Sequence, residues 1–373
     1  MERIIGFFIN PVAGVGGRAA LKGSDGEEVV SCALALGIEP EAANRAKAAL
    51  LPLVPYKDSV LFLTYGGPMG ADILKEAGFE YIVVGEPPSP STSADTKAAA
   101  LSIRDAGAEL IIFAGGDGTA RDVCEALGNS LVVLGIPAGV KMHSAVYALN
   151  PQSAGLGAAD FLSGKASGQR AAEVMDIDED AFRNGKVSAR LYGYLEVPTL
   201  SGHLQTSKSS SSPDEDELVG MAGYIVNNME PDALYLIGPG STTMAILDDM
   251  RLPGTLLGVD VLQNNELVLA DANEAQLWGL LEQAKGNAYI VLTPIGGQGM
   301  LLGRGNQQFS PRILWRIGKG NMQIVATRAK LRSLEGRPLV VDTGEAELDA
   351  HLCGYQDVIV DYEQTVFYKI SDQ

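Results

Sequence analysis

Apolar and polar positions alternate regularly over the first 140 residues of the chain. Short, nearly uninterrupted apolar runs predict strands at residues 4–9, 60–64, 81–84, 110–113 and 131–136. The stretches between them carry apolar residues at helical spacing and predict helices at residues 28–36, 41–51, 68–77, 94–106 and 120–127. Such alternation is typical of a doubly wound, mostly parallel sheet, in which ligands bind beyond the carboxyl ends of the strands.

The pattern changes near residue 165 and later returns to strand–helix alternation. Residues 173–178 and 187–197 alternate like strands around Asn184-Gly185, a strong hairpin signal. A run of Ser, Asp and Glu from residue 205 to 217 predicts a flexible loop, with a phosphorylation site or a lid as alternatives. Further elements are expected as strands at 234–237, 255–259, 288–292, 322–326 and 338–341, a helix at 273–284, and a final hairpin from 357–360 and 365–370.

These patterns predict an α/β protein of two domains. Residues 1–150 would form an N-terminal, doubly wound, mostly parallel domain that binds phosphate. Residues 151–373 would form a second, mixed α/β domain that includes the β-hairpin region at about 170–230. A chain of 373 residues has enough material for both cores.

The segment Gly115-Gly116-Asp117-Gly118-Thr119 lies between a predicted strand and a predicted helix. Its glycines let backbone N–H groups approach a ligand closely, and the N-terminus of a helix favours phosphate. A carboxylate here suits a site that takes a proton from an attacking hydroxyl or organises Mg²⁺. Asp117 is therefore the candidate catalytic residue, and Gly115, Gly116, Gly118 and Thr119 are candidate phosphate ligands. The alternative is an ordinary turn with Asp117 near the helix N-cap.

Three further loops carry candidate nucleotide- or phosphate-binding residues. Asn10 and Gly14 lie in the glycine-rich segment after the first strand. Lys141 follows the strand at 131–136 and is a candidate phosphate clamp, with a solvated lysine as the alternative. Gly240, Ser241 and Thr242 follow the strand at 234–237, where backbone amides and hydroxyls suit a second phosphate or a ribose. A helix N-terminus capped by Ser241 or Thr242 is the alternative for that loop.

Composition narrows the partners that the chain is expected to have. The net charge is −18 and the pI is about 4.6, so the surface repels nucleic acid and anionic membranes. The three cysteines lie far apart, which predicts reduced thiols in a cytoplasmic protein and argues against a zinc site. The first residues lack the basic and long apolar regions of a signal peptide, so we expect none. No apolar run approaches about 20 residues, the length that spans a bilayer. We expect a small-molecule substrate, and a homo-oligomer is left open.

The order of three motifs along the chain resembles that in the NAD kinase and diacylglycerol kinase superfamily. These are G-G-D-G-T, Gly240-Ser241-Thr242 and Leu292-Thr293-Pro294-Ile295. The best overall resemblance is to the ATP-NAD kinase-like family, which includes the acetoin-catabolism X protein. The resemblance implies an ATP-dependent phosphotransferase with NAD as the first-choice acceptor, a step of NADP biosynthesis. Mg²⁺ is expected as a cofactor because phosphate is transferred between anions on an acidic protein, although no metal-ligand cluster is identified in the sequence. We also expect the first two loops to face each other across one cleft, because both are of the phosphate-binding type, they lie on separate predicted domains, and ligand pockets favour domain interfaces.

The chain departs from the pattern of typical NAD kinases, which carry an Asn-Glu pair between the first two motifs. Asn227-Asn228-Met229-Glu230 has the residues without the spacing, and Asn265-Glu266 comes too late in the chain. Two alternatives therefore stay open: a kinase for another small metabolite or a lipid head group, and a non-catalytic nucleotide sensor. From the sequence, Asp117→Asn is expected to abolish transfer and to leave the melting temperature nearly unchanged, because Asn can still cap the helix.

Overall fold

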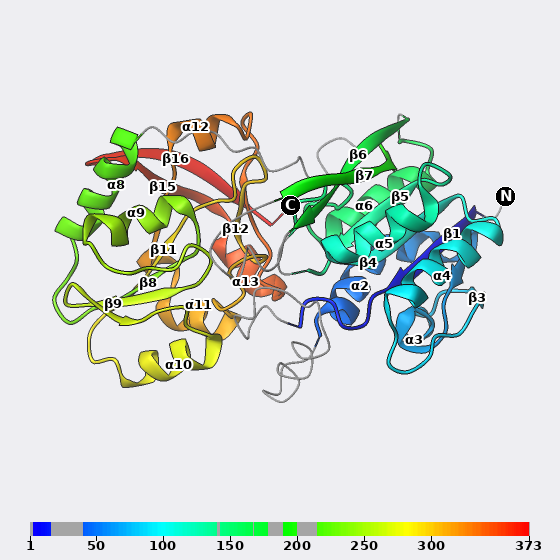
Figure 1. Ribbon diagram of the computed structural model, residues 1–373, viewed down its shortest axis with the longest axis horizontal. Coiled ribbons are helices and arrows are strands. Elements are labelled where there is room, and N and C mark those ends of the chain that lie inside the picture. Colours follow the sequence, from blue (N-terminus) through cyan, green and yellow to red (C-terminus); the bar gives the residue numbers. More distant parts are fainter. Residues whose placement is uncertain are drawn as a thin grey trace. The chain divides into compact units, whose positions relative to one another are not determined.

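The computed structural model describes residues 3–15, 40–139, 142–166, 168–177, 189–199 and 215–372. These residues form two compact units, one that ends at residue 199 and one that begins at residue 215 (Figure 1). The domain boundary expected after residue 150 stays a prediction. Lys141 and the predicted helix at 28–36 lie outside the described residues.

The first unit is built on a five-stranded sheet in which every strand pairs parallel to its neighbours. Its order is β3-β2-β1-β4-β5, so the chain builds one side of β1 first and then crosses to the other side. The strands are β1 (Arg3–Ile9), β2 (Val60–Thr64), β3 (Tyr81–Val83), β4 (Leu110–Gly115) and β5 (Val133–Pro137). This confirms the expected doubly wound, parallel arrangement.

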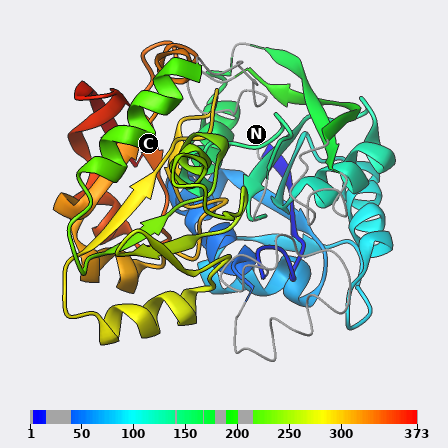
Figure 2. The same ribbon diagram turned by 60° about the vertical axis from the view of Figure 1, so that its left-hand side comes forward.

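The helices of the first unit form two groups, as right-handed crossovers on the two sides of β1 require (Figures 1 and 2). Helix α2 packs against α3 and α6, whereas α4 packs against α5. The helices are α2 (Ala42–Leu50), α3 (Ala71–Ala77), α4 (Ser93–Asp105), α5 (Asp117–Leu127) and α6 (Pro151–Leu162), with 3₁₀ turns η1 (Leu51–Ser59) and η2 (Gly67–Met69). All residues of β4 and β5 are buried, which explains why their sequences are almost uninterrupted apolar runs.

The predicted hairpin is present in the first unit. Strands β6 (Gln169–Ile177) and β7 (Ala189–Pro198) pair antiparallel, and the turn predicted at Asn184-Gly185 lies outside the described residues. Ala145 donates a backbone hydrogen bond to Glu173 on β6, so the hairpin is joined to the segment after β5.

The second unit is a mixed sheet of nine strands among the described residues, in the order β10-β9-β8-β11-β13-β15-β16-β14-β12. Strands β8, β11, β13 and β15 run parallel, and the final hairpin β15–β16 is antiparallel as expected. The strands are β8 (Leu234–Ile237), β9 (Asp260–Gln263), β10 (Glu266–Leu269), β11 (Ala288–Leu292), β12 (Met300–Leu302), β13 (Met322–Val325), β14 (Leu339–Val341), β15 (Gly354–Asp361) and β16 (Gln364–Ser371).

Helices cover both faces of this second sheet. Along β8, Leu234 and Leu236 belong to one apolar cluster, while Tyr235 and Ile237 belong to the other. The helices are α8 (Glu215–Asn227), α9 (Ser241–Asp249), α10 (Glu274–Gln283), α11 (Pro311–Ile317), α12 (Arg328–Arg332) and α13 (Ala346–Leu352), with the 3₁₀ turn η3 (Lys319–Asn321). The mixed α/β character expected for this part of the chain is confirmed.

Two local predictions in the second unit are wrong. Residues 255–259 form a loop rather than a strand, because the buried carboxylate of Asp260 accepts hydrogen bonds from the Thr255 N–H and hydroxyl and from the Asp271 N–H. The polar segment predicted to be a loop up to residue 217 already enters α8 at Glu215, where acidic side chains in a first turn favour the helix. Residues 205–214 lie outside the described residues.

Within the described ranges, no helix combines the length and the apolar character that crossing a membrane requires.

Candidate functional site

The candidate residues of the first unit meet at the carboxyl ends of β1 and β4, which are neighbours in the sheet. Asn10 follows β1, and its side-chain amide donates a hydrogen bond of 3.1 Å to the hydroxyl of Thr119 in α5. Its backbone N–H donates to the carbonyl of Ala114 on β4. The strand order reverses between β1 and β4, and ligands of open parallel sheets bind at such a point.

Close packing explains the glycines of this edge. A Cβ on Gly115 would lie 2.3 Å from the Thr119 hydroxyl oxygen, and a Cβ on Gly116 would lie 3.2 Å from the Cα of Gly139. Gly14 has a φ of +85°, and a Cβ there would lie 2.5 Å from the carbonyl oxygen of Ala138. The three loops after β1, β4 and β5 are therefore in contact at their backbones.

The first turn of α5 leaves its backbone donors available. The N-cap is Gly116, which offers no side chain to accept them, and the helix is eleven residues long. The amides of Asp117, Gly118 and Thr119 have no acceptor within the helix, and donors of this kind bind phosphate. The structure thus brings together Asn10, Gly14, Gly115, Gly116, Asp117, Gly118 and Thr119; their functional roles remain predictions.

Asp117 is buried, and it makes contacts that the sequence did not predict. One carboxylate oxygen accepts the backbone N–H of His143 at 2.7 Å, and the other accepts the N–H of Ser144 at 3.0 Å. The hydroxyl of Tyr147, a fully buried side chain, donates to the carbonyl of Gly116 at 2.5 Å. Asp117 therefore anchors the segment after β5 to the glycine turn.

The imidazole of His143 lies beside this carboxylate. Its Nδ1 is 3.6 Å from the Oδ2 of Asp117, the ring is buried, and neither ring nitrogen has a hydrogen-bond partner among the residues that the structure describes. Arg45 on α2 is also buried and donates to the carbonyl of Pro137 at the end of β5. Neither residue carries a local sequence signal, because each reaches this edge only through the packing of distant elements.

In the second unit, Gly240, Ser241 and Thr242 follow β8, and Gly240 has a φ of +135°. Thr293 follows β11, which is the parallel neighbour of β8, so both motifs lie at the carboxyl ends of neighbouring strands. We call this end of the two strands the Gly240 edge. The ammonium group of Lys330 donates to the hydroxyls of Thr242 and Thr293, each at 2.9 Å. Sequence reasoning missed Lys330, since a lysine in a short helix far along the chain has no motif of its own.

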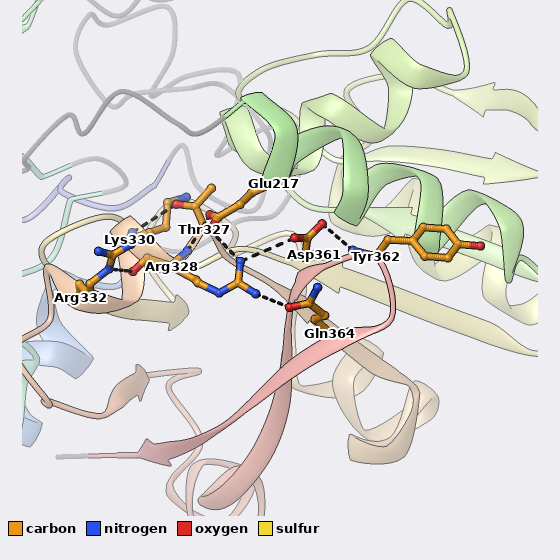
Figure 3. Close-up of polar contacts among 8 residues, drawn as sticks. All are labelled: Glu217, Thr327, Arg328, Lys330, Arg332, Asp361, Tyr362 and Gln364. Atoms are coloured by element: carbon orange, nitrogen blue, oxygen red, sulfur yellow. Dashed lines mark hydrogen bonds and ion pairs between the residues drawn. The ribbon is translucent and has the colours of Figure 1, made fainter.

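Arg328 holds the short helix that carries Lys330 (Figure 3). Its backbone N–H and its guanidinium both bind the buried carboxylate of Glu217 on α8, at 2.9 Å each. The same guanidinium lies 3.7 Å from the carboxylate of Asp361 and donates to the side chain of Gln364 at 2.6 Å. The helix is therefore fixed to α8 and to the β15–β16 turn.

The two Asn/Glu pairs noted in the sequence lie at the amino end of β8, opposite the Gly240 edge. Glu230 precedes β8, and its carboxylate accepts the Tyr289 hydroxyl at 2.6 Å and the Asn287 amide at 2.8 Å. These bonds lower the pKa of Glu230, and the same carboxylate raises the pKa of Tyr289 to about 12. Asn265 lies in the β9–β10 turn, beside the amino end of β8. Neither pair can complete a site at the Gly240 edge.

A metal ion held by the protein alone does not fit the described residues. Nowhere in the part of the chain that the structure describes do three His, Cys, Asp or Glu side chains gather as a ligand set. Mg²⁺ in phosphotransferases is commonly held by one or two carboxylates and by the phosphates of the substrate.

Comparison with known families agrees with the motifs and their order. The model of the ATP-NAD kinase N-terminal domain matches residues 5–166, and the model of the ATP-NAD kinase C-terminal domain matches residues 230–370. No curated protein and no solved structure matches the chain. Together the two family models span most of the chain, the first containing the Asp117 turn and the second containing Gly240, Thr293 and Lys330. The chain therefore belongs to the ATP-NAD kinase family.

Proposed function

We propose that this protein is an ATP-dependent phosphotransferase that phosphorylates a hydroxyl of NAD or of a related small molecule. The observation that carries the proposal is the meeting of Asn10, Asp117 and Thr119 at the point where the strand order of the first sheet reverses. Membership in the ATP-NAD kinase family supports ATP and NAD as the substrates. A cytoplasmic location and the absence of nucleic-acid and membrane partners remain expectations from the sequence.

In this proposal the first turn of α5 binds the phosphates of the donor. Gly115, Gly116 and Gly118 let the backbone approach them, and Thr119, held by Asn10, adds a hydroxyl. Asp117 takes the proton of the acceptor hydroxyl. The acceptor oxygen then forms a bond to the γ-phosphorus of ATP. The bond from that phosphorus to the β–γ bridging oxygen breaks, and its electron pair stays on the leaving nucleoside diphosphate.

The other candidate residues take supporting roles in this proposal. Gly240, Ser241 and Thr242 bind a second phosphate or a ribose, and Lys141 and Gly14 belong to the nucleotide site. If Mg²⁺ takes part, it would reach the site on the phosphates of ATP and would neutralise their charge.

NAD is the first-choice acceptor, although the described residues offer no Asn/Glu pair at the Gly240 edge. Another small metabolite or a lipid head group therefore remains the alternative acceptor. The test is a transfer assay with ATP against NAD, against other nucleosides and sugars, and against lipid head groups, read by phosphorus NMR. NADP formed from NAD, and lost in the Asp117→Asn variant, is the expected result. Product from another acceptor alone would exclude NAD.

One observation favours a non-catalytic nucleotide sensor as the second candidate function. Both carboxylate oxygens of Asp117 already accept backbone hydrogen bonds, which gives this residue a structural task independent of any reaction. A sensor would bind ATP or NAD in equilibrium measurements and would transfer phosphate to no acceptor of the panel.

A further inference from the structure

Lys330, which belongs to none of the sequence motifs, connects the Gly240–Thr242 loop to the motif that contains Thr293. Lys330 donates hydrogen bonds of 2.9 Å to Thr242, in the first turn of α9, and to Thr293, directly after β11. Thr242 is 4% exposed and Thr293 is 8% exposed, so both hydroxyls are largely withdrawn from water. Lys330 is thus the group that holds two loops of one sheet edge together.

The Lys330 ammonium group and the hydroxyls of Thr242 and Thr293 define what the Gly240 edge can bind. An ammonium group only donates, so both threonine oxygens accept from it and each hydroxyl keeps its own hydrogen to donate elsewhere. The edge therefore offers two oriented O–H donors beside a positive charge. A charge-assisted arrangement of this kind suits a phosphate group, and it is a local exception on a chain with a net charge of −18.

The position of Lys330 is set by a network of its own (Figure 3). Helix α12 has five residues, too few to be stable alone, and Thr327 caps it by accepting the N–H of Lys330 at 3.2 Å. Arg328 ties the helix to Glu217 with two bonds, one from its backbone and one from its guanidinium. Lys330 consequently projects from a fixed backbone rather than from a free loop end.

We propose that Lys330 is a positioning residue of the nucleotide site. It holds the hydroxyls of Thr242 and Thr293 so that the Gly240–Thr242 loop and the segment after β11 bind a nucleotide phosphate together, and Arg328 anchors it. This inference rests on the proposed function and assigns a ligand class, a phosphate group carried by a nucleotide, to this edge. Lys330 takes no part in the transfer itself, so it acts on substrate binding.

The test compares Lys330→Met with Lys330→Arg and with the exposed Lys285→Met as the matched control. Equilibrium binding is measured with ATP, NAD, inorganic pyrophosphate and adenosine, alongside KM, kcat and the melting temperature. We expect Lys330→Met to weaken at least one phosphate-bearing probe about tenfold or more and to leave adenosine binding unchanged. KM should rise by a similar factor while kcat changes less than about threefold, and Lys330→Arg should restore most of the binding.

Thr293→Val keeps the shape of the threonine side chain and provides a second, milder variant if Lys330→Met folds poorly. It should weaken the same phosphate-bearing probe several-fold. Equal loss of adenosine and phosphate binding, or unchanged phosphate binding in a folded Lys330→Met protein, would overturn the proposal. If the native protein binds phosphate through Lys330 but phosphorylates no acceptor, the proposed function fails and this inference stands. If no phosphate-bearing probe binds the native protein, both fail.

Discussion

The substitution Asp117→Asn tests whether the residue at the centre of the glycine turn has a structural task as well as a chemical one. In the native protein each carboxylate oxygen accepts one backbone N–H, from His143 and from Ser144. An Asn side chain has one carbonyl oxygen, so its NH₂ group must face the second N–H donor. The structure therefore predicts a loss of stability, whereas the sequence alone predicted almost none.

The size of the loss follows from those two contacts. One hydrogen bond to a charged group disappears, which costs about 1.5–3 kcal/mol, and a buried donor left without an acceptor adds about 1–3 kcal/mol. In a domain of about 150–250 residues each kcal/mol lowers the melting temperature by about 2–4 °C. The two costs together amount to about 2.5–6 kcal/mol, so we expect a fall of about 5–24 °C, measured by calorimetry or circular dichroism, together with the loss of phosphoryl transfer.

The matched control is Asp122→Asn, a second buried aspartate on the same helix. Asp122 accepts a hydrogen bond from the Ser93 hydroxyl, and burial raises the pKa of its carboxyl. An amide oxygen can accept that bond, and the ion pair with Lys97 that is lost is long, at 3.9 Å. This variant should therefore melt within about 3 °C of the native protein and keep its activity. A melting temperature of Asp117→Asn within about 1 °C of the native value would refute the structural argument. Full transfer activity would remove Asp117 from the mechanism.

Three further predictions follow from single contacts. Gly115→Ala places a Cβ 2.3 Å from the Thr119 hydroxyl oxygen, so the first turn of α5 must shift. We expect a destabilisation of about 1–3 kcal/mol, measured by urea unfolding. An unchanged urea midpoint would contradict this prediction. The His143 ring is buried without a hydrogen bond to any described residue, which is costly, so His143→Leu should leave the melting temperature equal or higher. A clear fall would show that the ring has a partner in solution. The pKa of Tyr289 is raised to about 12 by Glu230, so its stabilisation is complete below the unfolded value near 10 and is lost as the pH rises through about 12. In an ultraviolet titration Glu230→Gln should move one tyrosine back toward 10, and an identical curve would count against the hydrogen bond.

Local sequence was sufficient to predict those elements whose burial is visible in their own residues. Strands β4 and β5 could be predicted because a strand covered on both faces is apolar throughout. The turn at Gly115–Thr119 was recognisable because glycines that pack against backbone or side chains leave no alternative residue type. The loop at residues 255–259 was misread because its apolar residues resemble a strand. The buried carboxylate of Asp260 instead binds Thr255 and Asp271, which are not adjacent to it in the sequence.

What the sequence by itself determined is thus most of the elements of the first unit, the family motifs and the residues of the glycine turn. In the second unit, strands β9, β10 and β12 and helices α11, α12 and α13 had not been predicted. Only the tertiary structure decided which loops share an edge: Asn10 meets Thr119 across 109 positions, and Lys330 meets Thr242 across 88. It also decided that Glu230 lies at the wrong edge to serve the Gly240 loop. The physical reason is that hydrogen bonds between distant residues depend on strand order and direction, which the packing of the whole chain selects and no local pattern contains.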